Sequence, residues 1–205
     1  MMTPMTSRPD RRSFLYSGLA AVGLAALPLP AFALSDASAK SLVTKIVSEI
    51  NKVIASGKSE RAMINDFEQI FIRYADVSII ARSTLGADSR RATNTQMRSF
   101  TQVFQGYVAR KYGKRFREFI GGRIEVKSVR RTKSWHEVIS TAYLQGSSPF
   151  EVRFLVSDRS GKVLFFDMVI EGVSLRLSER TEIGAMLDAR QGDINALIRD
   201  LKKAG

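Results

Sequence analysis

Apolar residues in the first half of the chain recur at intervals of three and four, the spacing typical of amphipathic helices. The pattern predicts helices from about Ser35 to Gly57, from Ser59 to about Tyr74, from Asp76 to Gly86 and from Thr93 to Gly121-Gly122. The stripe of the first helix comprises Leu42, Val43, Ile46, Val47, Ile50, Val53 and Ile54. One face of the fourth is unusually aromatic, with Phe100, Phe104, Tyr107, Tyr112, Phe116 and Phe119.

Beyond Gly122 the period of the apolar positions changes from near 3.6 to 2, which is typical of strands. Four strands are predicted, at residues 123–131, 135–144, 150–157 and 162–171, with short connections rich in turn residues. Short connections indicate an antiparallel meander. Two helices, at residues 174–190 and 193–203, end the chain. This order predicts an α+β domain whose helices pack on one face of a curved four-stranded antiparallel sheet.

The first 33 residues have the pattern of an export signal. Arg11-Arg12 precede a long uncharged apolar stretch, Pro28 and Pro30 end it, and Ala31-Phe32-Ala33 has the small-x-small form that a signal peptidase recognises. We therefore predict a twin-arginine signal peptide at residues 1–33, cleaved after about Ala33; the prolines and the cleavage motif argue against an uncleaved anchor. The expected product is a single soluble domain, residues 34–205, in a bacterial periplasm.

The charge of the chain indicates anionic partners. The whole sequence has a formal net charge of +12, and the 29 basic and 19 acidic residues after position 33 give +10. In a periplasm such an excess favours phospholipid headgroups, lipopolysaccharide or acidic protein surfaces over nucleic acid, although plain solubility explains it equally well. A docking rim and an ordinary solvated face are alternative roles for Arg90, Arg91, Lys111, Lys114, Arg115, Arg117 and Arg123.

The residue types that most enzymes need are scarce. The chain has no cysteine and a single histidine, His136, without a Gly-x-Ser-x-Gly motif, so a hydrolase is not expected. His136-Glu137 lacks the second histidine of a zinc-protease motif, because position 140 is serine. The sequence therefore predicts no enzyme, no metal and no cofactor, and a structural His136.

Asp167 is an acid inside an otherwise apolar predicted strand. A buried carboxylate is costly without a partner, so we expect Arg180, Arg82 or backbone amides to hold it as a structural anchor. The rest of the chain has many aromatic and aliphatic side chains and few candidate catalytic groups. The helices and the sheet could enclose either a packed core, which the pattern alone favours, or an apolar pocket.

Several motifs resemble the MlaC (toluene-tolerance) family over about residues 46–201. They are Asp76, Ala81-Arg82, Leu85-Gly86, Arg90 to Thr93 with Gln96, Phe100 and Phe104, then Asp167 to Leu175, Arg180 and Gly192 to Ile198. The resemblance implies an NTF2-like fold with an apolar cavity. It also implies a periplasmic phospholipid carrier that shuttles lipid between an outer-membrane lipoprotein/porin complex and an inner-membrane ABC transporter, maintaining outer-membrane lipid asymmetry.

In such a carrier the acyl chains are expected to contact Phe100, Phe104, Tyr107, Val126, Val138, Ala142, Phe154, Phe166 and Met168. The sequence departs from the family at Ser89, Val163, Glu179 and Ile183, where the family usually has larger aromatic rings. These departures leave open the identity of the lipid, including a hopanoid. A non-enzymatic periplasmic adaptor with a solid core remains the alternative from a different class.

Overall fold

The computed structural model describes residues 34–205, without the side chains of residues 115–117. The predicted signal peptide therefore lies outside the described residues. Six α-helices are described: α1 (Asp36–Ile54), α2 (Glu60–Tyr74), α3 (Val77–Leu85), α4 (Asn94–Gly113), α5 (Leu175–Asp188) and α6 (Ile194–Leu201). Two 3₁₀ helices, η1 (Gly86–Arg90) and η2 (Lys114–Phe119), follow α3 and α4.

Each α-helix begins where a side chain can accept a hydrogen bond from the first turn. These N-cap residues are Ser35, Ser59, Asp76, Thr93, Ser174 and Asp193. Such residues satisfy backbone N–H groups that have no partner within the helix. The helix starts therefore follow directly from the positions of short polar residues before each apolar stripe.

The aromatic helix is shorter than predicted. It ends at Gly113 instead of Gly121, and the chain continues as η2. Gly113 packs against α2, where a Cβ atom would stand 2.6 Å from Ile64 Cγ1. The close approach therefore requires glycine at this position. Because glycine is a poor helix former, it also weakens the helix at its end. The tighter turn of η2 leads to an edge-to-face contact between Phe119 and Phe150, with ring centroids 6.3 Å apart.

The strands form one antiparallel sheet in the order β1-β2-β3-β4-β5. Four of them match the predicted meander: β1 (Arg123–Arg131), β2 (His136–Tyr143), β3 (Phe150–Ser157) and β4 (Leu164–Ile170). The fifth strand, β5 (Val173–Ser174), was not predicted, because two residues are too few to show a period. Irregular register at Val126/Ser128 and at Leu155/Val156 marks two bulges, which bend a sheet.

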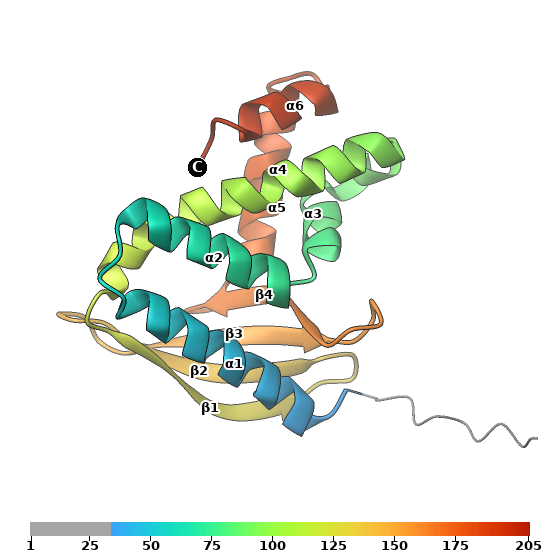
Figure 1. Ribbon diagram of the computed structural model, residues 1–205. Helices are drawn as coiled ribbons and strands as arrows, with labels where there is room; N and C mark the ends of the chain where they lie inside the picture. Colours follow the sequence, from blue (N-terminus) through green and yellow to red (C-terminus); the bar gives the residue numbers. More distant parts are fainter. Residues whose placement is uncertain (1–33) are drawn as a thin grey trace, which may run out of the picture. The chain divides into compact units, whose positions relative to one another are not determined.

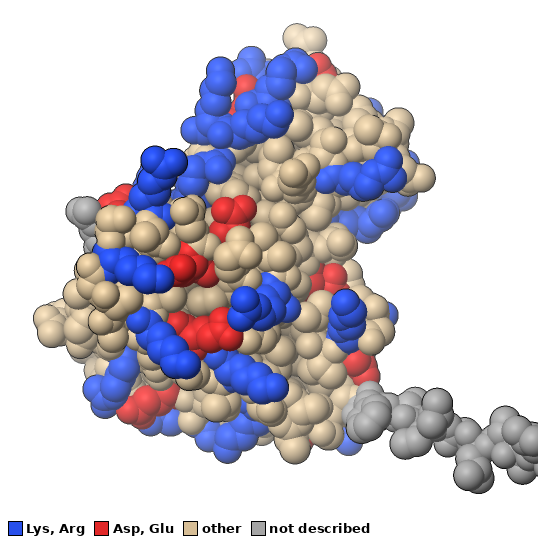
Figure 2. Space-filling model, viewed as in Figure 1, with Lys and Arg blue, Asp and Glu red and all other residues tan. Residues whose placement is uncertain are grey.

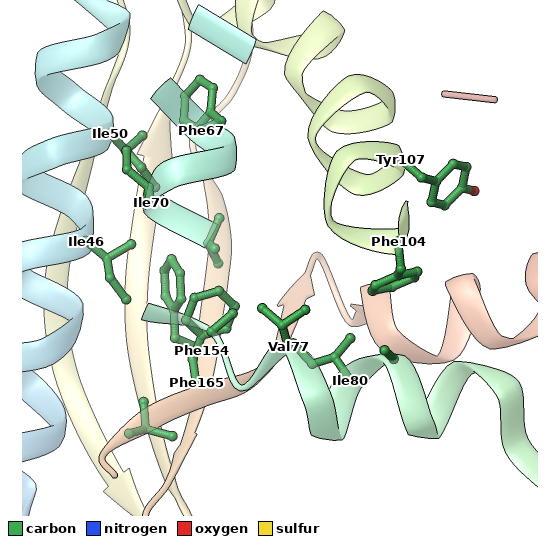
Figure 3. Packing of buried hydrophobic residues seen from close by; sticks show 14 of the residues in the cluster. Ile46, Ile50, Phe67, Ile70, Val77, Ile80, Phe104, Tyr107, Phe154 and Phe165 are labelled. Carbon is green, nitrogen blue, oxygen red and sulfur yellow. The ribbon is translucent and has the colours of Figure 1, made fainter. Parts of the chain in front are cut away.

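The helices form a helix layer that begins with α1 on one face of the sheet and extends past β4 (Figure 1). Helix α1 lies across β1 and β2, α2 packs between α1 and α4, and α6 packs on α4. A single cluster of buried apolar residues joins both layers. In Figure 3, Ile46 and Ile50 of α1 and Ile70 of α2 approach Phe154 and Phe165 of the sheet.

The start of α1 is held at the end of the sheet. Leu34 N donates a hydrogen bond of 3.0 Å to Asp158 Oδ2 in the turn after β3. His136, which is buried at the start of β2, has its Nε2 2.9 Å from Asp36 Oδ1. This position in the packed sheet agrees with the structural role predicted for His136.

Two kinds of feature are absent from the described residues, a membrane-spanning helix and a cluster of metal-binding side chains. Within residues 34–205 no helix is both long and apolar enough to span a bilayer. The same residues contain no group of three or more histidine, aspartate or glutamate side chains that could bind a metal ion.

Candidate functional site

An apolar cavity of about 120 Å³ lies between the helix layer and the sheet. We call it the inner cavity. Its apolar wall comes from seven elements. Helices α1 and α2 supply aliphatic and phenylalanine side chains, and β3 and β4 supply aromatic residues and a methionine. Ile80 of α3, Phe104 and Val108 of α4 and Leu175 of α5 complete it. The residues from α1, α2, β3 and β4 include Ile46, Ile50, Phe67, Ile70, Phe71, Phe154, Phe165, Phe166 and Met168.

Three phenylalanine rings in the wall of the inner cavity contact one another in tilted or edge-to-face arrangements. Phe154 and Phe165 meet nearly at right angles, with centroids 5.8 Å apart. Phe71 lies 6.2 Å from Phe165 in a tilted arrangement. Tilted and edge-to-face pairs are the favourable geometries for aromatic rings.

A second space, the outer groove, adjoins the inner cavity. It has a volume of about 470 Å³ and lies between the sheet, η2 and the start of α5. The two spaces share Ile50, Tyr112, Phe154, Met168 and Leu175. The outer part of the groove is lined by Phe119, Ile124, Leu144, Phe150, Val152, Ile170 and Val173. The two spaces adjoin along these shared residues, and we call them together the apolar path.

The residues predicted to contact acyl chains fall into three groups. Phe104, Phe154, Phe166 and Met168 line the inner cavity. Phe100, Tyr107, Val138 and Ala142 are buried in the core and line neither space. Val126 is half-buried in a separate surface groove between α1 and β1.

The sequence reasoning missed the contributions of α1 and α2. Ile46 and Ile50 belong to the apolar stripe of the first predicted helix, Phe67 and Ile70 recur at helical spacing in the second, and all four are buried. All four also line the inner cavity. Periodicity shows which side of a helix is buried, but it does not show which buried side chains border a space.

Asp167 lies at the edge of the inner cavity and is only 3% exposed. Its carboxylate accepts hydrogen bonds from Ser174 Oγ (2.6 Å), Arg176 N (3.0 Å) and Met168 N (2.8 Å). The guanidinium beside it belongs to Arg176, with Nε 3.6 Å from Oδ2. Asp167 therefore joins β4 to the start of α5, as expected of an anchor, but its arginine is neither Arg180 nor Arg82.

Arg180 has another position. It is exposed on α5, and its guanidinium lies against Gly86, where a Cβ atom would stand 3.2 Å from Arg180 Nε. Gly86 has a φ of +59°, a conformation that favours glycine. The Leu85-Gly86 and Arg180 positions of the sequence motif thus meet in space between α3 and α5.

A polar cluster, the α4–α5 cluster, bridges these two helices beside the inner cavity. It consists of Tyr107, Lys111, Tyr112, Glu179 and Glu182. Lys111 Nζ lies 2.7 Å from Glu179 Oε1 and also pairs with Glu182. Tyr107 OH donates to Glu182 Oε1 (2.7 Å), and Tyr112 OH donates to Glu179 Oε1.

The cluster shifts the pKa values of Tyr107, Lys111 and Glu182. Hydrogen bonding from Lys111 lowers the pKa of Glu182 below its usual value. Partial burial opposes the charge of Lys111, but the two carboxylates outweigh it and raise the pKa of the ammonium group. Burial, reinforced by Glu182, raises the pKa of Tyr107 far above its usual value. The cluster therefore favours the charged forms of Lys111 and Glu182.

The basic residues predicted to form a docking rim have different surroundings. Lys111 belongs to the α4–α5 cluster, Lys114 Nζ donates to Gly205 O (2.7 Å), and Arg123 Nε pairs with Glu125 (2.7 Å). Arg91 pairs with Asp88, and Arg90 is exposed at the end of η1. The side chains of Arg115 and Arg117 lie outside the described part of the chain.

These residues also lie far apart along the molecule. Arg90 and Arg91 precede α4, whereas Lys111 and Lys114 are at its other end, and a helix of this length spans roughly 30 Å. On the face shown in Figure 2, Lys and Arg lie beside Asp and Glu. That face therefore mixes both signs of charge.

Comparison with known proteins identifies the chain. The fold resembles that of a phospholipid-binding protein from Ralstonia solanacearum, solved in complex with a phospholipid. The TM-score is 0.69 at 18% sequence identity, and the match covers 80% of this chain and 95% of that one. Comparison with curated proteins gives no match. The MlaC protein family model matches residues 40–203, nearly all of the described chain, and the chain therefore belongs to the MlaC family.

Proposed function

We propose that this protein carries a phospholipid, with its acyl chains in the inner cavity and the outer groove. The observation that carries the proposal is the pair of adjoining, mostly apolar spaces between the helix layer and the sheet. Membership of the MlaC family and the phospholipid bound by the structurally similar Ralstonia protein support it. Phe104, Phe154, Phe166 and Met168, together with Ile46, Ile50, Phe67 and Ile70, are the proposed tail contacts.

The volumes of the inner cavity and the outer groove limit how a lipid can bind. The inner cavity is close to the ~150 Å³ cavity of an engineered protein that holds a single benzene molecule. It is therefore too small for two acyl chains in the form described. We propose that the chains also fill the outer groove and that the helix layer separates from the sheet when the lipid enters. The headgroup would then lie where the two spaces meet, beside Leu175 of α5.

Energetics decide how such a carrier must release its cargo. Burial of acyl chains contributes roughly 0.8 kcal/mol per methylene, so two chains of ~15 methylenes gain about 24 kcal/mol relative to water. That gain exceeds the practical ceiling for affinity, about 18 to 21 kcal/mol. Release into water would be far too slow, and the lipid must pass directly to a membrane or to a protein that buries it equally well.

The cellular setting belongs to the same proposal. We propose that the chain is exported by the twin-arginine route, cleaved after about Ala33, and exchanges lipid in the periplasm with an inner-membrane ABC transporter and an outer-membrane lipoprotein/porin complex. The exposed basic residues Arg90 and Arg123 remain candidates for docking. If docking is electrostatic, its association rate should fall as the salt concentration rises. The role is that of a carrier, not of an enzyme.

The proposal is tested by native mass spectrometry and lipid extraction on protein purified from the periplasm without detergent. Near one diacyl phospholipid per chain is the expected result. A bound hopanoid would mean that the cavity binds a lipid, but that this lipid is not a phospholipid. Protein that is free of lipid, and that takes none from vesicles, would overturn the carrier and favour an adaptor with a solid core.

A further inference from the structure

Glu179 is the one carboxylate of the α4–α5 cluster that borders the inner cavity. It lies on α5, one helical turn after Arg176, and is 2% exposed. Its Oε1 atom accepts hydrogen bonds from Lys111 and Tyr112. Its Oε2 atom is equally buried, and no described residue donates a hydrogen bond to it.

A buried acceptor without a donor is costly, by about 1–3 kcal/mol and more for a charged group. Holding Lys111 does not require this cost, because Glu182 also pairs with Lys111 from a half-exposed position. The other carboxylate at the cavity wall is paired: Asp167 accepts three hydrogen bonds and lies 3.6 Å from Arg176 Nε, itself a buried donor without a hydrogen-bond acceptor. The position of Glu179 is therefore better explained by a partner that comes from outside the chain.

We propose that Glu179 Oε2 accepts a hydrogen bond from the cargo, which makes Glu179 a specificity-determining residue. This inference rests on the proposed function and names the class of lipid: one whose polar end carries a hydrogen-bond donor, either an ammonium group or a hydroxyl group. Phosphatidylethanolamine and phosphatidylglycerol have such donors. Phosphatidylcholine has none, because its ammonium is fully methylated.

The selectivity follows from the unpaired acceptor. A donor-bearing headgroup that reaches the α5 wall of the cavity gains a charge-assisted hydrogen bond and removes the cost of the unpaired oxygen. A choline headgroup gains neither, so Oε2 stays unpaired in that complex. A site built to hydrogen-bond a donor discriminates strongly against an analogue that lacks it.

The experiment measures which lipids the protein takes from mixed vesicles. Protein purified from the periplasm is stripped of lipid and incubated with vesicles of equimolar phosphatidylcholine, phosphatidylethanolamine and phosphatidylglycerol. Bound lipid is then quantified by mass spectrometry. The informative ratio is ethanolamine to choline lipid, since neither lipid has net charge. We expect at least about a fivefold preference for the ethanolamine lipid. Enrichment of the glycerol lipid alone would identify a hydroxyl as the donor.

Two variants test whether the preference for ethanolamine lipid depends on Glu179. Glu179→Gln keeps the shape and one carbonyl acceptor for Lys111 and Tyr112, but it replaces the free acceptor with an amide donor, so the ratio should fall to about one. Glu182→Gln is the matched control, because Glu182 also contacts Lys111 but does not line the cavity, and its ratio should match that of the unmodified protein. Circular dichroism confirms that each variant is folded.

The outcomes separate this inference from the carrier proposal. Unmodified protein that binds lipid without preference, or a preference that survives Glu179→Gln, overturns the role of Glu179 and leaves the carrier intact. Equal loss in both variants would assign the effect to the cluster as a whole and would also overturn it. Failure to bind any lipid overturns the carrier itself.

Discussion

At the scale of single residues, the chain separates side chains that fill the core from side chains that border the apolar path. Phe100, Val138 and Ala142 are fully buried and fill the core, while Met168 is half-buried and borders both the inner cavity and the outer groove. Substitutions at the first kind of position test folding. Substitutions at the second kind test binding.

We expect Met168→Arg to reduce the lipid bound per protein by about tenfold or more, because a guanidinium beside acyl chains costs several kcal/mol. Val126→Arg places the same group on the sheet at a half-buried position away from both spaces, and it should bind lipid normally. Lipid extraction with quantification measures both, and circular dichroism checks the fold. Normal lipid content in Met168→Arg would show that the acyl chains lie elsewhere.

Removal of the Asp167 carboxylate should destabilise the protein. In Asp167→Ala the guanidinium of Arg176 loses its partner and three donors lose their acceptor. We expect a loss of about 3–5 kcal/mol in the free energy of unfolding, measured by urea titration. The control Asp88→Ala removes an exposed pair with Arg91 and should cost less than about 1 kcal/mol. A similar small loss for both variants would contradict the anchor.

The Glu182 carboxylate should make stability depend on pH. Its pKa in the folded protein lies below the usual value of 4.5, so its contribution is present above about pH 4.5 and is lost as the pH falls through the lower, folded pKa. The difference in unfolding free energy between the unmodified protein and Glu182→Gln should therefore shrink between pH 5 and pH 3. Urea titrations at several pH values measure this difference. A difference that does not change with pH would show that Glu182 is not held by Lys111.

At the scale of elements, the ends of helices and strands were largely predictable, because short polar caps and changes of period mark them. The start of α4 is an example: Thr93 Oγ1 accepts from Gln96 N, and Gln96 Oε1 accepts from Thr93 N, which forms a capping box. What could not be predicted depends on contacts between elements. The early end of α4 depends on the approach of Gly113 to Ile64, and β5 exists only because Ser174 pairs with β4.

The α4 cap gives a prediction of its own. Thr93→Ala removes the acceptor for Gln96 N and should lower the free energy of unfolding by about 1 kcal/mol. Thr93→Ser keeps a hydroxyl at the same position and should be close to neutral. Lipid binding should not change in either variant, since Thr93 lies away from the inner cavity and the outer groove. Loss of lipid in Thr93→Ala alone would instead connect the start of α4 to the cavity.

At the scale of the whole molecule, the periodicity of the sequence predicted two layers, and only the resemblance to the MlaC family implied an apolar cavity between them. A packed core and a cavity have the same periodicity, so the alternating residues of β3 and the stripe of α1 fit either. The difference arises from shape, because the rings of Phe71, Phe154 and Phe165 meet at angles that only the folded chain determines.

A carrier of this kind should be stabilised by its cargo. Lipid that binds the folded chain alone adds about 2.7 kcal/mol at a free concentration one hundred times Kd. We expect protein stripped of lipid to unfold at a lower temperature and to regain its stability after incubation with phospholipid vesicles. Calorimetry measures both midpoints, with mass spectrometry to confirm removal and reloading. Equal midpoints would mean that the apolar path is not a binding site.

The contact between Leu34 and the turn after β3 has a consequence for processing. Leu34 N is 3.0 Å from Asp158 Oδ2, and in the uncut chain it is an uncharged amide. Cleavage after Ala33, as the sequence predicts, converts that same nitrogen into an ammonium group beside a carboxylate. The hydrogen bond then becomes an ion pair, which strengthens it. Cleavage one residue earlier or later would move the new charge away from Asp158. The strength of this contact in the cleaved protein would therefore depend on where the peptidase cuts.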